Sequence, residues 1–73
     1  MRRKPQQLRS REMVDRLIDA TGKVIVARGL EYATTNHIAE EAGVNIASLY
    51  HYFGNKEEMI EALQDRLTQD LLQ

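Results

Sequence analysis

The apolar positions in the first half of the chain recur every three or four residues, which is the spacing of one face of an α-helix. They run from Met13 to Ile25, with Ser10 before them and Gly29 after them. Serine is common at the start of a helix and glycine directly after its end. The pattern therefore predicts an amphipathic first helix over residues 10–28. Gly22 lies inside it and costs about 1 kcal/mol of helix propensity relative to Ala, so we expect a compensating contact, such as the close approach of another helix.

Two shorter apolar repeats follow in the middle of the chain. Ile38–Ala42 gives an apolar face one helical turn long and is followed by Gly43, which suits the left-handed residue after a helix. Asn45 can cap a second short helix, in which Leu49 and Phe53 share one face as core residues. Two short helices joined by a glycine-containing turn are typical of a helix-turn-helix, although hairpins in other helical bundles look similar.

The last part of the chain predicts a fourth helix. Asn55 and Glu58, three residues apart, match the start of a helix with a capping box. The apolar positions that follow at helical spacing are Met59, Ile60, Leu63, Leu67 and Leu71. Leu30 and Tyr32, in the connection after the first helix, are expected to close the edge of the core. We predict an all-α fold: a three-helix helix-turn-helix (homeodomain-like) domain plus the start of a fourth connecting helix.

Length and composition narrow the classes of protein and site. With 73 residues the chain allows one small domain. The sequence has no cysteine, which excludes disulfides and thiolate metal sites. His37 lacks metal partners at useful spacing and is expected to be a solvated surface residue. We therefore predict no metal site. We also predict no cofactor. The apolar runs are too short for a membrane span.

The charge is distributed unevenly although the net charge is only −1. Up to Arg16 there are six basic residues and two acidic ones, and the rest of the chain has four basic and nine acidic residues. Such segregation lets one face bind a polyanion. Residues 1–9 are predicted to form a disordered basic arm, which either follows DNA or remains a solvated terminus without a partner.

The start of the second predicted helix is a candidate phosphate site. Thr34 is the expected N-cap, with its hydroxyl bound to the amide of Asn36 or His37. A helix N-terminus has free amides and a partial positive charge, which favour an anion. Thr34 and Thr35 therefore have two interpretations, as cap residues or as phosphate ligands, and both can hold at once.

Residues 45–52 form the candidate recognition helix, about 10 Å long. Only the first residues of such a helix need to reach base edges. Asn45 and Ser48 can hydrogen-bond to a base or a phosphate, whereas Ile46 and Ala47 offer apolar contact, for example to a thymine methyl group. Ile46 could instead contact the basic arm or a neighbouring molecule.

The sequence from Thr34 to Lys56 carries the most specific signal, the pattern T-T-x-x-I-A-x-x-A-G-V-x-x-x-S-L-Y-x-Y-F-x-N-K. It resembles the N-terminal DNA-binding domain of the tetracycline-repressor (TetR/AcrR) family of bacterial transcriptional regulators, and the resemblance extends from about Leu17 to Leu63. It implies a sequence-specific DNA-binding domain, usually of a repressor, with the recognition helix in the major groove of a palindromic operator.

The resemblance also implies roles for individual residues. It places Tyr50, Tyr52 and Lys56 on the phosphate backbone, and hydroxyl and ammonium donors suit that role. His51 is expected to join them, and ordinary core packing is the alternative for the two tyrosines. Asn36 stands where family members often have a basic side chain, so a guanine contact is in doubt, although Asn can pair with adenine.

The resemblance further implies a domain organisation and partners. We expect a basic arm over residues 1–9, a DNA-binding domain over residues 10–56, and over residues 57–73 the start of a linker helix to a domain absent here. In the family that domain binds a small-molecule effector and forms the homodimer. The expected partner of this chain is double-stranded DNA, and the expected location is the cytoplasm, at the nucleoid.

The sequence fits two other classes of function less well. A small helical protein-interaction module could use the apolar stripe from Met59 to Leu72, but it leaves the pattern from Thr34 to Lys56 unexplained. An enzyme is not expected, because neither histidine has a nucleophile or acid at helical spacing and the chain has no glycine loop for phosphate. Glu57 and Glu58 resemble paired carboxylates but suit the start of a helix. We therefore predict no catalytic residue.

Overall fold

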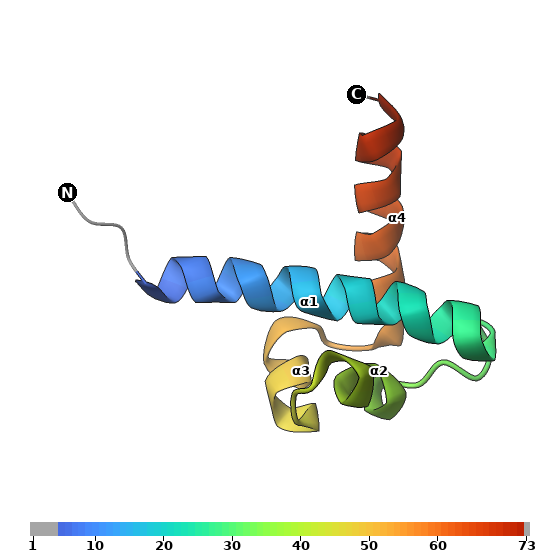
Figure 1. The fold of residues 1–73 in the computed structure, drawn as a ribbon, viewed down its shortest axis with the longest axis horizontal. Helices are drawn as coiled ribbons and strands as arrows, with labels where there is room; N and C mark the ends of the chain where they lie inside the picture. The colour runs from blue at the N-terminus through green and yellow to red at the C-terminus, as the bar shows by residue number, and fades with distance from the viewer. Residues whose placement is uncertain (1–4, 73) are drawn as a thin grey trace.

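The computed structural model describes residues 5–72 and consists of four helices (Figure 1). They are α1 (Pro5–Arg28), α2 (Thr35–Ala42), α3 (Ile46–Tyr52) and α4 (Lys56–Leu72). The long helix α1 lies across the molecule, with α2 and α3 together on one side of it (Figure 1). Helix α4 crosses α1 and extends beyond it on the other side (Figure 1). The all-α prediction is confirmed.

Helix α1 begins earlier than the sequence pattern predicted. It starts at Pro5 and passes through Ser10, which is therefore not its cap. Proline suits the first position of a helix because its fixed φ is already helical and its missing N–H would have no partner there. The residues between Pro5 and Ser10 include good helix formers and no helix breaker. Residues 5–9 of the expected arm therefore belong to α1, and the rest of that arm, residues 1–4, lies outside the described residues.

The predicted ends of the helices are otherwise confirmed. Gly29 follows α1 with φ 90°, and Gly43 follows α2 with φ 75°. The Thr34 hydroxyl accepts a hydrogen bond from the amide of His37 at 3.1 Å. At the start of α4 the Glu58 amide donates to Asn55 Oδ1 at 2.9 Å, and Glu58 Oε1 in turn accepts from the Gly54 amide at 2.7 Å. These short-range bonds fix where α2 and α4 begin.

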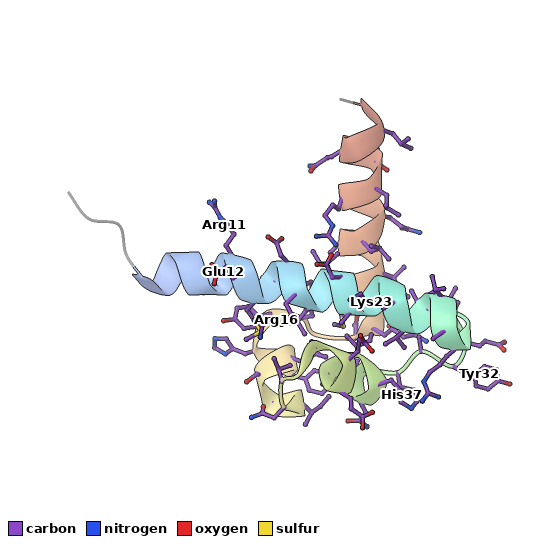
Figure 2. All side chains as sticks on the ribbon, in the orientation of Figure 1. Arg11, Glu12, Arg16, Lys23, Tyr32 and His37 are labelled. Carbon is purple, nitrogen blue, oxygen red and sulfur yellow. The ribbon has the colours of Figure 1, made fainter. Side chains whose placement is uncertain are left out.

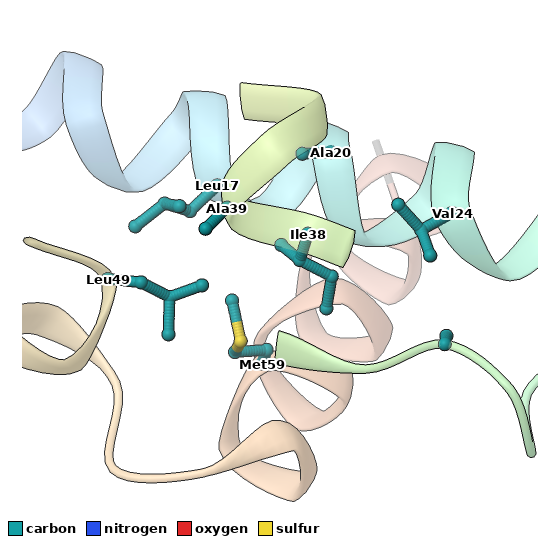
Figure 3. Packing of buried hydrophobic residues seen from close by; sticks show 8 residues of the cluster. Leu17, Ala20, Val24, Ile38, Ala39, Leu49 and Met59 are labelled. Atoms are coloured by element: carbon teal, nitrogen blue, oxygen red, sulfur yellow. The ribbon is translucent and has the colours of Figure 1, made fainter. Parts of the chain in front are cut away.

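All four helices contribute to one small core. Figure 3 shows side chains of α1, α2, α3 and α4 converging on Leu49 and Met59, which are fully buried. The members of the core cluster are Leu17, Ala20, Val24, Ala33, Ile38, Ala39, Leu49 and Met59. Phe53, predicted as core, is partly buried and packs against this cluster. The core thus holds α2 and α3 against α1 and fixes the start of α4.

The prediction that Leu30 and Tyr32 close the edge of the core is wrong. Their side chains are 55% and 68% exposed, and Ala33 is buried instead. The positive φ of Gly29 turns the chain, and the Tyr32 amide donates to the Gly29 carbonyl oxygen at 3.2 Å. This tight turn directs Leu30 and Tyr32 outward, and Figure 2 shows Tyr32 pointing away from the helices.

Gly22 lies where α1 meets α4. A Cβ atom at this position would lie 3.8 Å from both terminal carbons of Leu63, an ordinary van der Waals distance. Nearby, Arg66 of α4 donates to Asp19 of α1, and its guanidinium lies 3.9 Å from Asp15. The predicted approach of another helix is therefore present, but it leaves room for a methyl group.

Candidate nucleic-acid interface

The candidate surface is formed by the start of α2 and by α3, on the side of α1 opposite the free end of α4 (Figure 1). The α3 helix is only seven residues long, and its position depends on its neighbours. Its buried Leu49 anchors it in the core, and Ile46 and Tyr52 pack against the same cluster. Ala47, Tyr50 and His51 of α3 are exposed on the outside of the domain.

Thr35 and Tyr50 are brought together by the packing of α2 against α3. Thr35 Oγ1 lies 2.8 Å from the Tyr50 hydroxyl oxygen, although the two residues are 15 positions apart. Thr35 is partly buried, and Tyr50 is 49% exposed. Two predicted phosphate contacts therefore share one hydrogen bond at the surface.

Thr34 acts as the N-cap of α2, as predicted. Its hydroxyl oxygen accepts from the His37 amide and also lies 2.9 Å from His37 Nδ1. His37 is partly buried rather than fully solvated, and Figure 2 shows it beside the loop that enters α2. The Thr34 hydroxyl therefore holds both the amide and the ring of His37 at the start of α2.

At the start of α3, some of the predicted base-contact residues are exposed and others are partly buried. Asn45 is exposed, and its Oδ1 accepts from the Ser48 amide at 2.8 Å, so the side-chain NH2 group has the free donors. Ala47 is exposed, whereas Ser48 is partly buried. Ile46 packs against the core cluster, which accounts for this apolar side chain without a neighbouring molecule or the arm.

The end of α3 and the start of α4 carry the other predicted phosphate contacts. His51 is exposed and its ring packs edge-on against Tyr52, with centroids 5.1 Å apart. Lys56 is partly buried, and its Nζ donates to the carbonyl oxygen of Leu30 at 3.0 Å. An ammonium group has three donors, so two of those on Lys56 are left for another acceptor.

Charged residues around this surface are arranged unevenly. On α2, Asn36 is exposed near the start, and Glu40 and Glu41 follow it. Both glutamates line a hollow shared with Lys23 of α1, so they lie on the α1 side of α2. On α1, Figure 2 shows Arg16 on the edge toward α2 and α3 and Arg11 on the opposite edge, and Arg16 lines a hollow with Glu41 of α2. The acidic side chains of α2 thus sit beside basic ones.

The sequence interpretation missed three features of the site. These are the bond between Thr35 and Tyr50, the bond from Lys56 to Leu30, and the position of Arg16 beside Glu41 and Ala42 at the end of α2. The partners in the two bonds lie 15 and 26 residues apart, beyond the range of any local pattern. Only the basic character of the first sixteen residues pointed to Arg16.

Among residues 5–72 no group of three or more His, Cys, Asp or Glu side chains is arranged to hold a metal ion. No helix in this range is both long enough and apolar enough to cross a membrane.

Comparison with known proteins agrees with this geometry. Residues 17–63 match the family described as bacterial regulatory proteins, tetR family. The HTH-type transcriptional regulator PksA of Bacillus subtilis is 35% identical over 68 residues, which cover 88% of this chain and 33% of that protein. The HTH-type transcriptional regulator BetI of Brucella anthropi is 40% identical over 66 residues, covering 90% of this chain and 32% of that protein.

A repressor is among the similar proteins. The HTH-type transcriptional repressor KstR2 of Mycolicibacterium smegmatis is 40% identical over 57 residues, which cover 78% of this chain and 27% of that protein. The chain therefore spans about a third or less of the length of these relatives. No solved structure matches the chain significantly.

Proposed function

Because the chain belongs to the tetR family of bacterial regulatory proteins, we propose that it is the sequence-specific DNA-binding domain of a transcriptional regulator that acts as a repressor. The observation that carries this proposal is the bond between Thr35 and Tyr50. It joins the start of α2 to α3, so a helix N-terminus and a recognition helix share one exposed surface. A helix N-terminus with hydroxyl donors beside it suits a phosphate, and a short exposed helix suits the major groove.

Base contacts come from the first turn of α3. The free NH2 donors of Asn45 can reach an acceptor on a base edge while its oxygen continues to cap the helix. Ala47 offers its methyl group to a thymine methyl, and Ser48 supplies a further hydrogen bond. Asn36 adds one from the start of α2. Ile46 contributes through whatever part of its side chain the core leaves accessible, so it is the weakest of these candidates.

Phosphate contacts surround the base contacts. Tyr50, His51 and Lys56 place hydrogen-bond donors near the C-terminal end of α3. Tyr52 is partly buried, and its hydroxyl is the group that donates to a phosphate. Thr34 adds a hydroxyl at the start of α2, where the helix dipole also favours an anion, and the Thr35 hydroxyl lies beside it in its bond with Tyr50. These contacts fix the orientation of α3 in the groove but carry no sequence information.

The properties of the whole regulator are part of the same proposal. We place residues 10–56 in the DNA-binding unit and residues 57–73 in a linker helix to an effector-binding domain. A homodimer then reaches two half-sites of a palindromic operator, because a two-fold symmetric protein fits a two-fold symmetric site. Such a regulator acts in the cytoplasm, at the nucleoid, and catalyses no reaction.

A charge placed on the first turn of α3 tests the proposal. Ala47→Glu adds a carboxylate to an exposed position, and near the N-terminus of a helix an acid is favourable for the fold. The matched control Gln64→Glu adds the same charge to an exposed position on α4. We expect A47E to weaken binding to a mixed-sequence duplex at low salt by about tenfold or more, since a carboxylate repels nearby phosphates.

The two variants distinguish the function from a general charge effect. Binding is followed by fluorescence anisotropy of the labelled duplex, and thermal unfolding checks that both variants fold. Equal weakening by A47E and Q64E would mean that α3 does not face the DNA. No binding by the unmodified chain at low salt would overturn the proposed function.

A further inference from the structure

The hydroxyl groups of Thr35 and Tyr50 form a hydrogen bond, and which of the two donates decides which proton is left for another partner. Thr35 is the first residue of α2 and partly buried, whereas Tyr50 lies on α3 and is about half exposed. Their oxygens are 2.8 Å apart, and either atom can be the donor. Each hydroxyl has one proton to give and can accept at the same time. The pair can therefore adopt two arrangements.

Only one arrangement leaves the exposed tyrosine ready for a phosphate. The oxygens of a DNA phosphate accept hydrogen bonds and have no proton to donate. If Tyr50 donated to Thr35, its single proton would be used within the protein. If Thr35 donates to the Tyr50 oxygen, the phenol keeps its proton for the phosphate. Hydrogen bonds in such a chain also polarise and strengthen one another.

We propose that Thr35 is a positioning residue for DNA binding: it donates to the Tyr50 hydroxyl oxygen and holds the Tyr50 proton directed at a DNA phosphate. This proposal rests on the proposed function and adds a role within the same surface. It assigns the contribution of Thr35 to its bond with Tyr50 and not to a separate contact with DNA. Because the bond links α2 to α3, it also fixes the phenol relative to the start of α2.

A double-mutant cycle measures this coupling. The variants are Thr35→Val, which keeps the side-chain shape without the hydroxyl, Tyr50→Phe, and the combination of the two. Affinity for a mixed-sequence duplex is measured at low salt with the 73-residue chain. We expect Y50F to bind about tenfold more weakly, the effect of one lost hydrogen bond to a charged group. We expect T35V to lose about three- to tenfold, and to have no further effect once Tyr50 is Phe.

Two further measurements separate positioning from a structural role. Thr35→Ser restores the hydroxyl without the methyl group, and we expect its affinity to lie within about twofold of the unmodified chain. The slope of log affinity against log salt should stay constant in all variants, because neutral hydroxyls release no counterions. Thermal unfolding checks each variant, and Thr35→Ala replaces T35V in the cycle if T35V fails to fold.

The failures of the two proposals are distinguishable. Multiplying losses from T35V and Y50F would mean that Thr35 acts independently of Tyr50, and an unchanged affinity of T35V would mean that it does not act at all. A loss in T35S equal to that in T35V would assign the effect to packing of the methyl group. Each of these overturns the positioning role while DNA binding stands, whereas an unmodified chain that does not bind overturns the function itself.

Discussion

Among the described residues Lys56 has one hydrogen-bond partner, and we propose a second partner outside the fold. Its Nζ donates to the Leu30 carbonyl oxygen, and two donors remain for a phosphate. We expect Lys56→Gln to weaken binding to a mixed-sequence duplex by about fivefold at low salt and to lower the salt slope by about one, because one fewer phosphate is neutralised. Titrations at several salt concentrations measure both quantities.

A second lysine provides the control. Lys23 is exposed on α1 and lines a hollow with Glu40 and Glu41, away from α3. Lys23→Gln removes the same charge and should leave the salt slope unchanged. If K56Q lowers the melting temperature but leaves the slope intact, Lys56 only fastens the loop after α1.

At the scale of single residues, the sequence predicted interactions that act over short range. Thr34 and Asn45 cap helices because their oxygens reach an amide three residues ahead, and that spacing is visible in the sequence. The exposure of Ile46 was not predictable in this way. A seven-residue helix takes its rotation from what it packs against, and that packing turns Ile46 toward the core.

The crossing of α1 and α4 allows a test of how the elements are held together. The hydrogen on Gly22 faces Leu63 with room for a Cβ atom at 3.8 Å. We therefore expect Gly22→Ala to stabilise the domain by up to about 1 kcal/mol, since alanine restores the helix propensity that glycine lacks. Urea unfolding followed by circular dichroism measures the free energy of unfolding.

The same substitution elsewhere should have the opposite sign. Gly29 has φ 90° directly after α1, a conformation that side chains with a Cβ rarely adopt. Gly29→Ala should therefore destabilise the domain by about 1–2 kcal/mol. A destabilised G22A would mean that the α1–α4 contact is tighter than its distances indicate and that glycine is required there.

The number and order of the helices could be predicted, while one boundary could not. Apolar periodicity and the glycines at positions 29 and 43 mark α1, α2 and their ends. The sequence places the start of α1 at Ser10 because serine is a common cap residue. Whether the helix begins at Ser10 or at Pro5 depends on whether the residues between them join it, which the sequence pattern does not decide. The arrangement of α4 across α1 depends on Gly22 and Leu63 meeting, which periodicity alone does not specify.

For the whole molecule, the arrangement of charge explains how a chain of net charge −1 can bind DNA. Helix α4 carries acidic residues and is 17 residues long, or about 25 Å. It extends away from α2 and α3 (Figure 1). At 0.1 M salt charges are screened over about 10 Å, so the far half of α4 repels DNA on the α3 side only weakly.

This separation predicts where DNA is detected along the chain. In a two-dimensional amide NMR titration with a mixed-sequence duplex at low salt, we expect shifts at residues 34–36 and 45–56 and little change at residues 61–71. The shifts should shrink at higher salt, because binding without a specific operator depends on released counterions. Shifts concentrated at residues 61–71 would instead favour a partner on the exposed Leu67 and Leu71, the part of the α4 stripe that the core leaves free. Because Met59 is fully buried, that exposed stripe is shorter than the sequence suggested.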